Sequence, residues 1–267
     1  MVNPLAATNW ISSIAGFGVG AAVGMTGIGG GSLMTPLLVL LFGFAPVTAV
    51  GTDLWFAAVT KVVGGTFHNR KGTVDWQVLG RMSMGSIPAC IVTLIWMDHT
   101  RTAQMQHGTL LRALGGVLLA TSLAVMLRKY VHSLGSRLRT STATSFVRAQ
   151  PWLTVLAGVV LGVAVPLTSV GAGALGSAML LYIYPFRMTP SRLAGTDIVH
   201  AIPIATLSGL GHLLMGNVDF KLLISLLIGS IPGICLGTVI STKSPDRFLR
   251  IAISLVLAVV SLKLLAS

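Results

Sequence analysis

The feature that most constrains this chain is its division into ten apolar segments that carry very little charge. The segments run over residues 10–24, 32–44, 46–67, 78–97, 109–127, 152–166, 172–184, 190–212, 221–241 and 248–265. A helix that crosses a lipid bilayer needs about 20 apolar residues. Six segments approach or exceed this length, while the other four are shorter and form two adjacent pairs. The pattern predicts an all-α membrane protein with several transmembrane helices.

The composition supports a lipid environment. Of the 267 residues, 54% are hydrophobic and 9% are charged, and the mean hydropathy is +0.87. Such a chain has too little polar surface to cover a soluble globule. The net charge of +12 would suit nucleic acid in a soluble domain, but most basic residues lie in short gaps between apolar segments, where they orient helices in the membrane. We therefore expect contact with membrane lipid, no nucleic-acid partner, no cofactor and no bound metal.

The second half of the chain repeats the first. An offset of 142 residues places the glycine-rich stretch 26–31 on 168–173, and an offset of 144 places Gly-Thr-Asp 51–53 on 195–197. The same larger offset also matches His68 with His212, Val74-Asp75 with Val218-Asp219, and residues 85–88 with 229–232. Matches in the same order over this much of the chain indicate a duplication.

The basic residues predict that the two halves have opposite orientations. A basic linker at 128–151 is expected on the cytoplasmic side, together with the loops 68–81, 185–192 and 243–250, which places thirteen of the eighteen Lys and Arg residues inside. The equivalent loops that begin at His68 and His212 then fall on opposite sides, so we predict an inverted-topology repeat. The predicted units are a first repeat 1–127 (broken pair 10–44, helices 46–67, 78–97 and 109–127), the linker 128–151, and a second repeat 152–267 (broken pair 152–184, helices 190–212, 221–241 and 248–265).

Two glycine-rich breaks predict where a substrate binds. Inverted repeats with broken helices are typical of alternating-access transporters, and half-helices that begin at Gly31 and Gly173 would direct free N–H groups and a positive dipole end toward an anion. The candidate substrate-binding residues are Thr26, Gly27, Gly29, Gly30, Gly31, Ser32, Thr52, Thr168, Ser169, Gly171, Gly173 and Thr196. Alternatively, the glycines only allow helices to approach closely.

Two of the six acidic residues, Asp53 and Asp197, lie inside apolar segments. A charged side chain at mid-membrane costs about 2.5–3.5 kcal/mol on insertion scales, so such a residue is a functional candidate. In one interpretation the pair exchanges protons, or binds a cation such as Na⁺, during transport. In the other, each Asp caps a broken half-helix by accepting backbone N–H bonds. His200, one turn after Asp197, is a candidate partner in coupling.

Further polar residues are assigned structural roles. We expect the long side chain of Lys61 to extend along its helix to the membrane interface. The loop residues His68, His212, Asp75 and Asp219 are predicted to act as cap and gate elements.

The pattern Gly24-Met25-Thr26-Gly27-Ile28-Gly29-Gly30-Gly31, with Pro36, Ala49-Val50-Gly51-Thr52, His68 and Gly72-Thr73-Val74-Asp75, resembles the sulfite exporter TauE/SafE family, also called the 4-toluene sulfonate uptake permeases. The resemblance covers both halves. It implies a multi-pass carrier of the bacterial inner membrane that moves sulfite, organosulfonates or related small sulfur-containing anions, usually as an exporter. The family pattern commonly has Ser after Gly-Thr, so Asp53 and Asp197 depart from it, which leaves the substrate and the coupling mechanism open.

Other classes compete with an anion carrier. An intramembrane aspartyl protease also uses two membrane-embedded Asp residues, but the sequence lacks the Gly-x-Gly-Asp signature, and we expect no enzymatic activity. A small-anion channel, or a carrier of a cation or metal that uses Asp53 and Asp197, is the main alternative. Exact substrate, direction, coupling ion and oligomeric state stay open.

Overall fold

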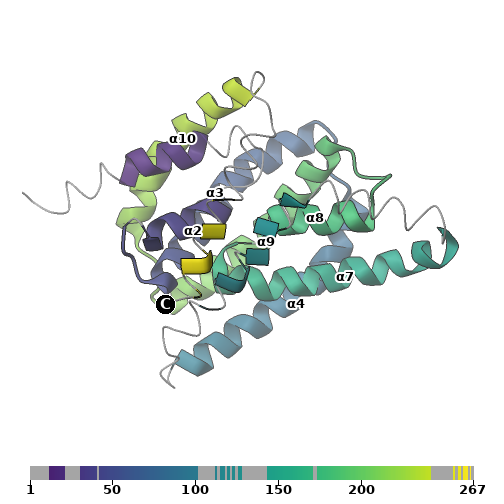
Figure 1. Ribbon diagram of the computed structural model, residues 1–267, viewed down its shortest axis with the longest axis horizontal. Helices are drawn as coiled ribbons and strands as arrows, with labels where there is room; N and C mark the ends of the chain where they lie inside the picture. Colours follow the sequence, from purple (N-terminus) through teal and green to yellow (C-terminus); the bar gives the residue numbers. More distant parts are fainter. Residues whose placement is uncertain are drawn as a thin grey trace, which may run out of the picture.

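The computed structural model describes residues 12–21, 31–40, 42–101, 143–170 and 173–241, with isolated positions between 112 and 127 and between 255 and 265. Within the continuous ranges the regular structure is helical (Figure 1). The elements are a helix over Ser12–Ala21, α2 (Gly31–Leu40), α3 (Pro46–Arg70), α4 (Trp76–Arg101), α7 (Ala143–Thr168), α8 (Ala174–Ile183), α9 (Pro190–Leu214) and α10 (Phe220–Ser241).

Several of these helices are compatible with a membrane. Four spans are long and apolar enough to cross one: Pro46–Arg70, Trp76–Thr100, Val147–Thr168 and Pro190–Leu214. Large apolar side chains such as Val63, Met84 and Trp152 are exposed on the outside of the protein, where lipid rather than water would surround them. The predicted all-α membrane class is therefore confirmed.

Most predicted segments correspond to observed helices, but α7 is longer than its predicted segment 152–166. It has 26 residues and begins at Ala143, inside the range predicted for the linker. Hydropathy marks only the apolar part of a helix, and here the helix continues through polar residues such as Arg148. The predicted helices 109–127 and 248–265 lie outside the described residues, apart from isolated positions.

Helices α3 and α9 pack against each other in antiparallel fashion at the centre of the fold (Figure 1). Gly65 on α3 lies against Ile202 of α9, and Trp55, more than two turns earlier, lies against Gly209. The Trp55 indole Nε1 donates a hydrogen bond of 2.9 Å to the Gly209 carbonyl oxygen. Both buried Gly-Thr-Asp motifs lie on this central pair.

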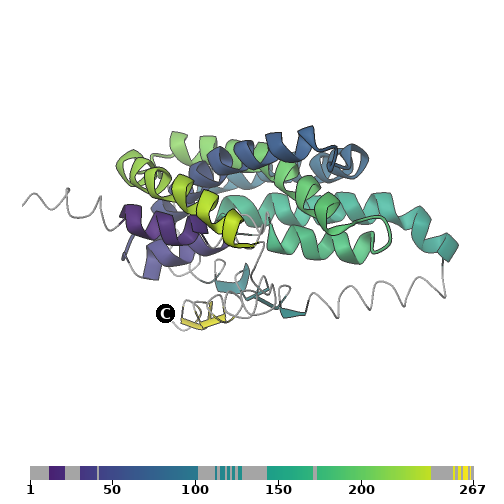
Figure 2. The ribbon, with the colours of Figure 1, turned by 90° about the horizontal axis from the view of Figure 1, so that it is seen from above.

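Two further helix pairs flank the centre: the helix 12–21 beside α10, and α4 beside α7 (Figures 1 and 2). In both pairs the helices approach so closely that a Cβ on an interface glycine would overlap the backbone of the partner. The equivalent contacts are Gly16 with Leu226, Gly20 with Ser230, Gly158 with Met82 and Gly162 with Ser86. Within each pair the two helices run parallel to each other. The repeat offsets of 142 and 144 residues convert the residue contacts of one pair into those of the other.

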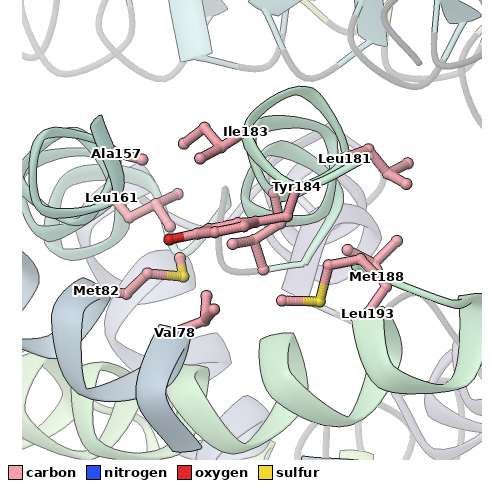
Figure 3. Packing of buried hydrophobic residues seen from close by; sticks show 10 residues of the cluster. Val78, Met82, Ala157, Leu161, Leu181, Ile183, Tyr184, Met188 and Leu193 are labelled. Atoms are coloured by element: carbon pink, nitrogen blue, oxygen red, sulfur yellow. The ribbon is translucent and has the colours of Figure 1, made fainter. Parts of the chain in front are cut away.

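A core of apolar side chains holds α8 against α4, α7 and α9 (Figure 3). Tyr184, which directly follows α8, is buried there among residues such as Met82 and Leu161. Its hydroxyl lies 2.8 Å from Thr154 Oγ1 on α7. This anchor at the C-terminal end of α8 helps to fix the position of the short helix, and with it the direction of its N-terminus.

Candidate functional site

The two half-helices begin at the predicted glycines. Helix α2 begins at Gly31, and α8 begins at Ala174 with Gly173 as its N-cap. Gly173 has no side chain that could accept a hydrogen bond from the first N–H groups of α8. Of the other predicted site residues, Ser32 lies in the first turn of α2, while Thr26, Gly27, Gly29, Gly30 and Gly171 lie outside the described residues.

Asp53 is fully buried and binds near the N-terminus of α2. Its Oδ2 accepts hydrogen bonds from the Thr35 backbone N–H (3.2 Å) and the Thr35 hydroxyl (2.5 Å). Its Oδ1 accepts none from the described residues. The Ser169 hydroxyl also lies near this carboxylate. Asp53 therefore contacts one half-helix at Thr35, the fifth of its ten residues, and lies close to Ser169 at the break of the other.

Ser169 itself has an unusual backbone. It follows the last residue of α7, and its φ of 57° is in the left-handed region, which residues other than glycine rarely adopt. Thr168 holds the turn locally: its hydroxyl donates to the Ala164 carbonyl (2.7 Å) and accepts from the Val170 N–H (3.1 Å). Strained backbone is found preferentially at functional sites, so the break after α7 remains a candidate part of the binding site.

Asp197 occupies the position at α8 that Asp53 occupies at α2. It is buried, and a Cβ placed on Gly176, the third residue of α8, would come within 2.5 Å of Asp197 Oδ1. The absence of a side chain at Gly176 thus allows the carboxylate to approach the start of α8. A helix N-terminus stabilises negative charge, and each of the two half-helices has a buried carboxylate near its start.

Thr52 and Thr196, the central residues of the two motifs, make reciprocal contacts. Thr52 Oγ1 accepts the backbone N–H of Asp219 at 3.1 Å, and Thr196 Oγ1 accepts that of Asp75 at 2.9 Å. Each hydrogen bond therefore joins one half of the chain to the other. The repeat offset of 144 residues relates Thr52 to Thr196 and Asp75 to Asp219, so the two hydrogen bonds are equivalent.

The glycine before each threonine is explained by the same contact. A Cβ on Gly195 would lie 2.8 Å from the Thr73 carbonyl oxygen, and a Cβ on Gly51 would lie 3.1 Å from the Asn217 carbonyl carbon. These distances are shorter than ordinary van der Waals contact. The motif needs glycine because the loop of the opposite half lies directly on its backbone.

The predicted caps are confirmed for Asp75 and Asp219. Their Oδ1 atoms accept the Val78 N–H (3.2 Å) and the Leu222 N–H (3.0 Å), in the first turns of α4 and α10. Asp75 also forms a two-point ion pair with Arg187, with N–O distances of 2.7 and 2.9 Å. The gate role of these loops stays a prediction.

Three histidines are singled out by the sequence. His68 and His212, predicted in loops, lie in the last turns of α3 and α9 instead, and all three histidines contact neighbouring residues. His200 Nε2 lies 3.0 Å from Ser86 Oγ on α4, which joins α9 to α4 in the buried interior. His212 Nε2 lies 2.8 Å from the Pro166 carbonyl oxygen, and His68 Nδ1 lies 2.9 Å from Thr73 Oγ1. The role of His200 in coupling stays a prediction.

Lys61 does not extend to the membrane interface as predicted. Its relative exposure is 5%, and it interacts electrostatically with Asp197 and Asp53. The prediction is wrong because the side chain of Lys61 is buried between α3 and α9, the two helices that carry the buried carboxylates. The signal was present in the sequence, since buried carboxylates need a nearby cation.

The comparisons with known proteins agree over nearly the whole chain. The model of the family described as "Sulfite exporter TauE/SafE" matches residues 12–264. The probable membrane transporter YjnA of Bacillus subtilis is 37% identical over 94% of this chain and 97% of its own length, and the probable membrane transporter YdhB of the same organism is 28% identical over 93% and 97%. The probable membrane transporter MJ0441 of Methanocaldococcus jannaschii is 24% identical over 94% and 93%. No solved structure matches the chain.

Proposed function

Because the chain belongs to the sulfite exporter TauE/SafE family and is a membrane transporter rather than an enzyme, we propose that it moves sulfite, an organosulfonate or a related small anion. The proposed setting is the bacterial inner membrane, the direction export, and the mechanism alternating access. The observation that carries the proposal is the pair of half-helices, each with a buried carboxylate, Asp53 or Asp197, near its N-terminus.

Reciprocal contacts between the halves support the alternating-access mechanism. In such carriers the substrate lies near mid-membrane between two inverted repeats. The repeat offsets relate the hydrogen bond of Thr52 to that of Thr196. They also relate the contacts of one parallel helix pair to those of the other. The two halves of an inverted repeat can exchange conformations, so each equivalent loop contact would open when the other closes.

The carboxylates supply a physical link between anion and proton. When Asp53 is ionised, its negative charge occupies the start of α2 and repels an anion. When the carboxyl group is protonated, the positive end of the half-helix is free to attract one. The same holds for Asp197 at α8. Proton binding and anion binding would therefore favour each other, so the anion and the proton would cross in the same direction. An imposed pH gradient would drive the anion toward the side of lower proton concentration, and export would be driven by an outward gradient of the anion itself.

The two carboxylates also support the alternative of a cation carrier. Asp53 Oδ1 is buried and accepts no hydrogen bond from the described residues. This oxygen could therefore coordinate Na⁺ or take up a proton. In this alternative the carboxylates bind the transported ion itself, and sulfite would neither move nor compete.

The test is sulfite flux into proteoliposomes with an imposed pH gradient. We expect the parent protein to move sulfite in a saturable, gradient-dependent manner, and Asp53→Asn and Asp197→Asn each to lose the dependence on the gradient. Asp98→Asn, at an exposed position of α4, is the matched control and should behave as the parent. Unchanged gradient dependence in both buried variants would identify the aspartates as helix caps. Sodium uptake without sulfite uptake would favour the cation carrier.

A further inference from the structure

Lys61 lies between the two buried carboxylates along the central helix pair. On α3 it follows Asp53 by eight residues, about 12 Å along the helix axis. Since α9 is antiparallel and Gly64 lies against Ile198, the adjacent Asp197 is level with the turn of α3 that follows Lys61. The lysine is thus flanked by one carboxylate toward each end of the helix pair.

The charged groups around Lys61 come from both helices. Its ammonium group interacts electrostatically with Asp197 and, more weakly, with Asp53, and its charge also acts on His200. The side chain is almost completely buried. An ammonium group at such a site needs a compensating negative charge, and these two carboxylates supply it in the described residues.

The duplication provides two carboxylates but one lysine. The offset of 144 takes Asp53 to Asp197 and Lys61 to Ala205, which is 2% exposed. Under the inverted-repeat proposal, the lysine lies close to the pseudo-two-fold axis, where a single cation is near both carboxylates. A residue needed only to neutralise Asp53 would have an equivalent beside Asp197.

We propose that the Lys61 ammonium group binds the transported oxyanion. This inference rests on the proposed function and adds a residue to it. Without substrate, an ionised carboxylate of Asp53 or Asp197 balances the lysine. When a monovalent oxyanion such as hydrogen sulfite binds the ammonium group, that carboxylate takes up a proton, and the buried site keeps its net charge. An ammonium group with three N–H donors suits the oxygens of sulfite.

The experiment measures sulfite exchange at equal pH on both sides of proteoliposomes, as a function of sulfite concentration. Lys61→Met removes the charge and keeps most of the side-chain volume. We expect its half-saturating sulfite concentration to rise by about 10- to 100-fold, as for loss of a hydrogen bond to a charged group. Lys61→Arg keeps the cation and should stay within a few-fold of the parent. Lys221→Met, at an exposed position of α10, should match the parent.

The possible outcomes separate this inference from the proposed function. If the parent moves sulfite and Lys61→Met saturates at the parent concentration, Lys61 does not bind the anion, while the anion-carrier function stands. If the parent exchanges neither sulfite nor an organosulfonate in this assay, both are overturned. A lower maximal rate at unchanged half-saturation would indicate a structural lysine and would also overturn the inference. If Lys61→Met does not fold, the double variant Lys61→Met/Asp53→Asn is used instead, because it removes one charge of each sign. Its half-saturating sulfite concentration is then compared with that of the single variant Asp53→Asn.

Discussion

Replacing Gly85 by alanine should force α4 and α7 apart. A Cβ at this position would lie 2.9 Å from the Val159 backbone nitrogen and would overlap the Val155 carbonyl oxygen. Ordinary contact begins at 3.4 Å, so the partner backbone would have to move by at least about 0.5 Å. Backbone cannot rotate away as a side chain can, and the whole helix pair must separate.

The expected loss of stability is about 1–3 kcal/mol, the usual range for overpacking. At about 2–4 °C per kcal/mol, the apparent Tm in detergent should fall by about 2–12 °C. Gly229→Ala should behave alike, because its Cβ would lie 2.9 Å from the Phe17 backbone nitrogen in the equivalent helix pair. The assay is thermal unfolding followed by size-exclusion chromatography of the remaining folded protein.

The matched controls are glycines of the same helices that face open space. A Cβ on Gly80 of α4 or on Gly18 of the helix 12–21 meets no atom within 4 Å. Alanine there should leave the Tm unchanged or raise it slightly, since alanine favours helix by about 0.5–1 kcal/mol over glycine. If Gly85→Ala is as stable as Gly80→Ala, the close packing of α4 and α7 is refuted. A large difference between Gly85→Ala and Gly229→Ala would contradict the equivalence of the two pairs.

Two further predictions concern the contacts around Asp75. Thr196→Val leaves the buried Asp75 N–H without its acceptor and should lower the free energy of unfolding by about 1–3 kcal/mol; Thr66→Val, at an exposed position, should have little effect in the same thermal assay. Arg187→Gln breaks the ion pair with Asp75, but because the Arg187 side chain is 39% exposed, we expect a loss of only about 1 kcal/mol. A loss larger than that of Thr196→Val would show that solvent screens this pair less than assumed.

The elements of the fold could be predicted because hydropathy and glycine act locally. The segment predicted over 46–67 corresponds to Pro46–Arg70, and the half-helices begin at Gly31 and directly after Gly173. Asp75 and Asp219 could be assigned as caps because they stand immediately before apolar helices, where a carboxylate accepts free N–H groups. Such predictions need no knowledge of which helices are neighbours.

Contacts that join distant parts of the chain could not be predicted in this way. The bond from Asp75 to Thr196 spans 121 residues and the ion pair with Arg187 spans 112; neither alters a local pattern. Lys61 was assigned to the interface because a lysine in an apolar helix is usually satisfied by water. In the structure its side chain is buried on the central helix pair that carries Asp53 and Asp197. The inverted orientation of the repeats stays a prediction, which the reciprocal contacts support.

The pairing of the helix 12–21 with α10 has a consequence for biosynthesis. The glycine-bearing face at Gly16 and Gly20 leaves the ribosome some 210 residues before its partners Leu226 and Ser230, about 10–40 s at usual translation rates. Throughout that interval the helix 12–21 lacks the surface against which it packs. This helix therefore cannot complete its packing until α10 has been made, and until then lipid or the insertion machinery would have to cover its glycine-bearing face.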